Sequence, residues 1–166
     1  MERDPYLKLK NPPHVSHDEQ CACLPPRIWK VMSALHPNPI HCIQCNLVIR
    51  PEQLELPSPL IDEIASWQNV YASIDRLWLD SGPYEKWALS ELSNLASPLN
   101  QRGLALAQKL RELNPCYYQV FEDQSSDDWK AKTVCLKCGK DLRRLSTSKH
   151  AHSVCDSCSL IFWAEQ

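Results

Sequence analysis

The feature that most constrains this chain is a set of four cysteines near its C-terminus. Cys135 and Cys138 are separated by two residues, as are Cys155 and Cys158, which gives the pattern C-x2-C-x16-C-x2-C. This spacing is typical of zinc sites, because a tight turn across each pair directs two thiolates at one ion. Two such turns complete a tetrahedron and leave no open coordination position. The pattern therefore predicts a structural metal held by a small β-sheet, a zinc ribbon.

A second group of cysteines lies in the N-terminal third of the chain, with the spacing C-x-C-x18-C-x2-C. This group, which we expect to bind a second zinc ion, consists of Cys21, Cys23, Cys42 and Cys45. The spacing is less standard, so two alternatives stay open. The thiols could be reduced and buried, or His36 or His41 could join one cysteine pair in a mixed site. The ninth cysteine, Cys116, is expected to pack in the core.

Composition indicates a folded protein of the cytoplasm. Hydrophobic residues make up 43% of the 166 residues and charged residues 23%, which is globular composition and not that of a disordered chain. The first residues carry no apolar signal segment, and the longest apolar run, Leu160 to Ala164, is far too short to span a membrane. Cysteine pairs in the cytosol are more often metal ligands than disulfides, which agrees with the zinc hypothesis.

The middle of the chain predicts three helices. The first begins near Ser58, a candidate cap, with Pro59 at the first helical position. One apolar stripe then follows at helical spacing: Leu60, Ile64, Trp67, Tyr71, Ile74 and Trp78. A second helix is expected over 84–96, and a third begins at Ser97 and ends before Pro115. Helices joined by such short breaks are expected to pack as an antiparallel bundle.

The flanking segments predict mostly strands. A short helix is expected over 27–35, and strands are expected at 47–49, 117–121, 129–134, 142–147 and 159–163. We therefore expect an α+β fold in which a central antiparallel three-helix region is flanked by an N-terminal zinc-tied segment and a C-terminal zinc-ribbon sheet. The corresponding parts are an arm and zinc segment over 1–50, a helical region over 51–116, and a strand and ribbon over 117–166.

Charge is distributed unevenly along the chain. Residues 129–166 hold seven bases and three acids, a net charge of +4, whereas residues 1–128 hold eleven bases and seventeen acids, a net charge of −6. The bases that could contact nucleic acid are Lys130, Lys132, Lys137, Lys140, Arg143, Arg144 and Lys149. A zinc ion with four thiolates carries −2, so the ribbon would support only weak, salt-sensitive binding. Trp129 and Trp163 could stack on bases or pack in the ribbon, and His150 and His152 are expected to be exposed.

Motifs of catalysis are absent from the sequence. It has no G-x-S-x-G, no glycine-rich phosphate loop and no H-E-x-x-H, and its three glycines leave little material for a phosphate cradle. We expect a protein that is not an enzyme, takes no small-molecule substrate and does not enter a membrane.

Several pieces of the chain, in order, carry a resemblance. They are Cys42-x-x-Cys45, Ser66-Trp67-Gln68 with Tyr71 and Asp75-Arg76-Leu77, Ser97-Pro98-Leu99-Asn100-Gln101-Arg102-Gly103, Tyr117-Tyr118 and the final cysteine quartet. Between Cys42 and Trp163 the chain resembles an uncharacterised bacterial family described as zinc-ribbon-containing, candidate nucleic-acid-binding proteins. The resemblance implies a zinc ribbon and a contact with nucleic acid.

Two functions remain in view. The first is a non-catalytic zinc-ribbon protein that binds DNA or RNA through the basic ribbon face. The second is a protein-binding adaptor, or an immunity protein that neutralises a toxin, which would use the acidic body against a basic partner. Metal storage or redox sensing is a weaker hypothesis, because closed four-thiolate sites protect their sulfurs.

Overall fold

The computed structural model describes residues 4–9, 17–32, 36–146 and 150–165. Six strands form one sheet: β1 (Trp29–Val31), β2 (Ile40–Cys42), β3 (Cys116–Gln119), β4 (Arg143–Leu145), β5 (His152–Cys155) and β6 (Leu160–Trp163). Along the chain, three α-helices follow β2 and precede β3: α1 (Ser58–Asp80), α2 (Glu85–Ser93) and α3 (Pro98–Arg111). Short 3-10 turns occupy Pro5–Lys8, His17–Glu19, Pro51–Gln53 and Gly82–Tyr84. The expected mixed α+β fold is therefore confirmed.

The sheet combines strands from the N-terminal and the C-terminal part of the chain, and β3 lies between the two sets. The strand order is β2-β1-β3-β6-β5-β4. β3 pairs in parallel with β1 on one side and with β6 on the other, whereas the outer pairs are antiparallel. The sheet thus brings together strands that precede the helices and strands that follow them.

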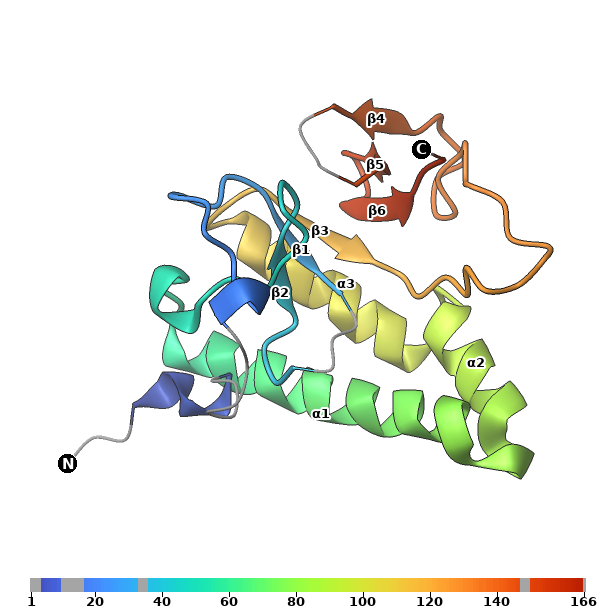
Figure 1. Cartoon of the computed structure of the whole chain (residues 1–166), viewed down its shortest axis with the longest axis horizontal. Coiled ribbons are helices and arrows are strands. Elements are labelled where there is room, and N and C mark those ends of the chain that lie inside the picture. The colour runs from blue at the N-terminus through green and yellow to red at the C-terminus, as the bar shows by residue number, and fades with distance from the viewer. Residues whose placement is uncertain (1–3, 10–16, 33–35, 147–149, 166) are drawn as a thin grey trace.

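The helices cover one face of this sheet (Figure 1). Their buried residues share a core cluster with alternate strand residues, among them Trp29, Tyr118 and Phe162. Trp67 on α1 is fully buried, and its indole N–H donates to the Leu99 carbonyl oxygen at 2.9 Å. Figure 1 also shows α3 running back beside α1, with β6 alongside the C-terminal end of β3 and with β5 and β4 further out. The apolar stripe of α1 thus faces the core, as the spacing predicted.

The motif Ser97-Pro98-Leu99-Asn100-Gln101-Arg102-Gly103 forms the start of α3, and three of its residues make specific contacts there. Ser97 caps the helix, since its hydroxyl accepts from the Asn100 N–H at 3.2 Å. The buried Asn100 amide donates to three carbonyls at the end of α2 and accepts from the Tyr118 hydroxyl at 2.6 Å. Gly103 packs directly on the Tyr118 ring, and a Cβ atom there would clash with it. These residues join α2, α3 and β3.

Several sequence expectations need correction. The segment expected to be a helix over 27–35 contains β1 instead, because Trp29 and Val31 alternate with Lys30 across the two faces of the sheet. The expected strand at 47–49 is reduced to two isolated bridges of Val48, to Gln20 and to His41. The expected strand over 129–134 is reduced to one bridge between Val134 and Asp141, and the strand over 152–155 was not anticipated. α1 begins at Ser58 after Pro57, so Ser58 is not its cap. His152, expected to be exposed, is fully buried.

The second face of the sheet contains a buried lysine. Lys30 on β1 is fully buried; its ammonium donates to Gln119 Oε1 at 2.8 Å and lies 3.3 Å from His152 Nε2 on β5. Neighbouring strands are about 4.8 Å apart, so a lysine can reach across β3 and β6 only if the sheet curls strongly. The ammonium also lies 4.9 Å from the Trp163 ring centroid, and that ring stacks on His152. Burial lowers the pKa of Lys30 to about 7.

Replacing Lys30 by methionine should flatten the dependence of stability on pH above neutrality. Between pH 7 and the unfolded pKa near ~10.4, the unfolded chain binds a proton that the folded chain has lost. The free energy of unfolding of the wild type should therefore rise with pH there, by at most about 1.4 kcal/mol per pH unit. Denaturant unfolding of Lys30→Met at several pH values measures this slope. The exposed Lys86→Met on α2 is the control and should keep it; an unchanged slope in Lys30→Met would contradict the assignment.

Candidate metal centres and the ribbon surface

Each group of cysteines predicted from the sequence converges in space. In the first group the four Sγ atoms of Cys21, Cys23, Cys42 and Cys45 lie within 4.8 Å of one another. The same limit holds for the second group, which consists of Cys135, Cys138, Cys155 and Cys158. In a tetrahedron with metal–sulfur bonds of about 2.3 Å, sulfur atoms are about 3.8 Å apart. The spacing therefore fits one metal ion in each group, and four thiolates are a set compatible with zinc.

The mixed site with histidine has no support from the geometry. His41 Nδ1 lies 3.2 Å from the Pro39 carbonyl oxygen, and the set that converges contains four cysteines and no histidine. Cys116, the remaining cysteine, is buried in the helix-facing core, as expected. The expected division of the nine cysteines into two groups of four and one core residue thus matches their positions.

The three C-x2-C pairs share one backbone conformation. The residue directly after the second cysteine has a positive φ in each: 63° at Asn46, 70° at Gly139 and 55° at Ser159. The turns are closed by backbone hydrogen bonds, for example from the Gly139 N–H to the Cys135 carbonyl oxygen at 2.8 Å. In the same turn the Lys137 N–H donates to Cys135 Sγ at 3.4 Å, which favours a thiolate. The repeated turn geometry directs the two sulfurs of each pair to one point.

The cysteine environments are compatible with a cation in each group. Burial raises the pKa of the Cys42 thiol to about 11 and that of Cys158 to about 12. In contrast, the backbone N–H of Lys140 lowers the pKa of the exposed Cys138 to about 6. Four thiolates in one group are therefore unfavourable at neutral pH unless a metal ion neutralises them.

We call residues 129–166 the ribbon. Asp156, between Cys155 and Cys158, links the ribbon to the rest of the protein through hydrogen bonds. Its carboxylate accepts two hydrogen bonds from Arg143, each 2.9 Å long, and one from the Tyr117 hydroxyl at 2.5 Å. Its backbone oxygen accepts from Arg111 on α3 at 2.7 Å. Hydrogen bonding to Arg143 lowers the pKa of Asp156. The only sequence signal for this contact is an acidic residue between the two cysteines of a C-x2-C pair.

The basic residues predicted to contact nucleic acid differ in whether they are free to do so. Lys130, Lys132, Lys137 and Lys140 are exposed. Arg143 forms an ion pair with Asp156, and Arg144 donates to the Glu165 carbonyl oxygen at 2.7 Å. Lys149 lies outside the described residues. Four lysines thus remain for an external partner.

The tryptophans named as stacking candidates are both half-buried. Trp163 stacks on His152 with ring centroids 4.7 Å apart, so that ring already packs within the sheet. Trp129 lines a hollow between the ribbon and α2. Trp163 lines two further hollows, so both rings have an edge at the surface.

Comparison with known proteins assigns the chain to a family but gives it no activity. Residues 36–121 match a family described as a domain of unknown function, DUF2310, and the chain belongs to that family. The matched segment includes Cys42 and Cys45 but not the C-terminal cysteines. No solved structure matches the chain significantly.

Two relatives, both described as uncharacterized proteins, come from the bacterium Haemophilus influenzae. Each is 27% identical over 143 residues, or 80% of this chain. The alignment covers 70% of one relative and 54% of the other, so the second is considerably longer than the part that matches. In the part of the chain that the structure describes, no helix is long and apolar enough to cross a membrane.

Metal content tests the two cysteine groups separately. The wild type should carry two metal ions per chain in native mass spectrometry, because each group supplies a full set of four sulfurs. Cys135→Ser with Cys138→Ser, and Cys21→Ser with Cys23→Ser, should each lose one ion. Cys116→Ser should keep both, since Cys116 belongs to neither group. A wild type with one ion, or metal loss in Cys116→Ser, would contradict the assignment.

Proposed function

We propose that this protein is a non-catalytic binding protein in which two zinc ions hold the two ends of one sheet, and that its C-terminal ribbon contacts DNA or RNA. The convergence of four sulfurs in each group supports the structural role of the metal, because a closed set of four thiolates has no position for a substrate. Histidines and carboxylates are not part of either group. The metals stabilise a surface, and that surface carries the function.

The observation that carries the nucleic-acid contact is the exposure of the lysines around the first cysteine turn of the ribbon. Lys137 lies within this turn and Lys140 just after it, beside the exposed Leu136. None of the four exposed ribbon lysines forms an ion pair with another described residue. A small number of lysines gives a modest, strongly salt-dependent affinity, because binding releases few counterions.

Charge reversal tests this contact. Lys137→Glu with Lys140→Glu should abolish retention on single- or double-stranded nucleic acid, whereas Lys86→Glu, an exposed reversal on α2, should bind like the wild type. Wild-type affinity should fall steeply between about 50 and 200 mM salt. Gel-shift titrations over this range measure both effects. A wild type that binds no nucleic acid at low salt would refute the contact.

A second candidate function is protein binding, as an adaptor or as an immunity protein that neutralises a toxin. It is favoured by the net charge of −6 over residues 1–128 and by an acidic hollow beside the ribbon. The product of a neighbouring toxin gene should then co-purify with this protein and lose its toxicity. If no gene beside this one encodes such a partner, the immunity role loses its support.

A further inference from the structure

The two cysteine groups differ in how well the fold covers their sulfur atoms. All four cysteines of the N-terminal group are buried or half-buried, and Cys21 and Cys42 are part of the helix-facing core. In the ribbon group three cysteines are buried, but Cys138 is exposed. Cys138 is the one exposed residue among the nine cysteines, all of which the structure describes. A reagent in solution can therefore reach a sulfur of the ribbon group without any opening of the fold.

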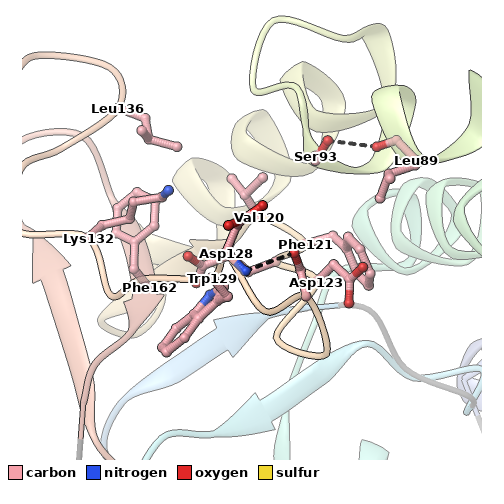
Figure 2. A pocket seen from close by; sticks show the side chains of 12 residues that line it. Leu89, Ser93, Val120, Phe121, Asp123, Asp128, Trp129, Lys132, Leu136 and Phe162 are labelled. Carbon is pink, nitrogen blue, oxygen red and sulfur yellow. Dashed lines mark hydrogen bonds between the residues drawn. The ribbon is translucent and has the colours of Figure 1, made fainter. Parts of the chain in front are cut away.

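The first cysteine turn of the ribbon, residues 135–140, has little packing of its own. Cys135 is its one buried residue, and the others are exposed. Figure 2 shows Leu136 at the rim of a hollow of about 360 Å³, across from Leu89 of α2. The backbone hydrogen bond from the Cys135 N–H to the Lys140 carbonyl oxygen, 2.8 Å long, shapes the turn from within. The position of this turn in the ribbon therefore depends strongly on where its two sulfurs are held.

The loop that lines the same hollow is anchored without any metal. Glu122, after β3, accepts from the Trp163 N–H at 3.0 Å and from the Trp129 indole N–H. Phe121 packs edge-to-face on Trp78 of α1, with the two ring centroids 4.7 Å apart. Loss of a metal ion from the ribbon would therefore free the first cysteine turn and leave the loop beside it in place.

A second sulfur lies close to the exposed one. Cys138 Sγ is 3.6 Å from Cys155 Sγ. Cys138 belongs to the first cysteine turn, whereas Cys155 is the last residue of β5. Rotation of the exposed Cys138 side chain can bring the two sulfurs to bonding distance, because the separation to be closed is only about 1.6 Å. A disulfide between them would keep the two cysteine turns of the ribbon joined after the metal has left.

We propose that the ribbon group is a redox-sensitive metal site, which releases its ion when a hydroperoxide oxidises Cys138, while the N-terminal group keeps its ion. The Cys138 thiolate attacks the outer oxygen of the hydroperoxide, the O–O bond breaks, and a sulfenic acid and an alkoxide form. The Cys155 thiolate then attacks the Cys138 sulfur, hydroxide leaves, and the disulfide forms. The two thiolates thus supply the two electrons that reduce the hydroperoxide to an alcohol and water, with protons from the solvent.

The metal ion then passes into solution, because Cys135 and Cys158 are the only ligands that remain and both take up protons. A thiol reductant reverses the change, since the disulfide keeps all four sulfurs near one another. The inference rests on the metal-binding part of the proposed function and goes beyond it by naming a regulation of the ribbon. Lys137 and Lys140 belong to the turn that is freed, so oxidation would also weaken a contact of these lysines with nucleic acid.

The test treats the full chain, loaded with zinc, with hydrogen peroxide and follows metal release with a zinc-binding dye. The untreated protein is first shown by native mass spectrometry to carry two ions. Peroxide should then release one ion, and the covalent mass should fall by two hydrogen atoms. Peptide mapping should find Cys138 joined to Cys155, and the cysteines of the N-terminal group should remain reduced. Addition of a thiol reductant with zinc should restore the second ion.

Two variants separate the role of Cys138 from general oxidation. Cys138→His keeps a metal ligand and removes the exposed sulfur, so it should carry two ions and release the ribbon ion at least about tenfold more slowly. Cys116→Ser, which changes a buried cysteine outside both groups, should release it at the wild-type rate. The disulfide map of the wild type tests the proposal even if Cys138→His does not hold the ion.

Three results would overturn the proposal: earlier loss of the N-terminal ion, a disulfide that does not include Cys138, or wild-type release from Cys138→His. A protein that carries two ions and keeps both in peroxide would reject the redox-sensitive site and leave the metal assignment standing. An untreated protein without the ribbon ion would reject the metal assignment, and this inference with it.

Discussion

The convergence of four sulfur atoms at each end of the sheet is the constraint on which the rest of this structure depends. Cys42 is the last residue of the edge strand β2, Cys155 is the last residue of β5, and Cys158 lies in the turn that leads to β6. The strands beside these cysteines are only three or four residues long. Isolated strands of that length are marginally stable in water. Metal ligation at the turns would supply the stability that such short strands lack.

A second set of contacts makes the ribbon part of the whole fold. β6 pairs with β3, and Asp156 links the ribbon turn to Arg143, to Tyr117 on β3 and, through its backbone, to Arg111 on α3. Asp156 stands one residue after Cys155, so its hydrogen bonds connect this cysteine group to the helix-covered part of the sheet. It also changes the interpretation of Arg143, which belongs to this link rather than to a free basic surface.

The features that sequence could predict are those set by local spacing. Cysteine spacing predicted both sulfur groups, and helical periodicity predicted α1 and α3, because each signal lies within a short window. The contact between Lys30 and His152 could not be predicted from the sequence, because the two residues are 122 positions apart and meet only through the curl of the sheet. The helix expected over 27–35 failed for a related reason: pairing with β3 determines the conformation of β1. Glu122 and Trp129 gave no sequence signal as a pair, since a folded loop brings them together.

The coordination shell of the bound metal tests the central claim most directly. X-ray absorption spectroscopy at the zinc edge of the protein as purified should give a first shell of four sulfur atoms at about 2.3 Å, averaged over two sites, with no nitrogen or oxygen neighbour. A shell that contains nitrogen or oxygen atoms, or a spectrum without zinc, would contradict an account in which two closed sets of thiolates hold the ends of this sheet.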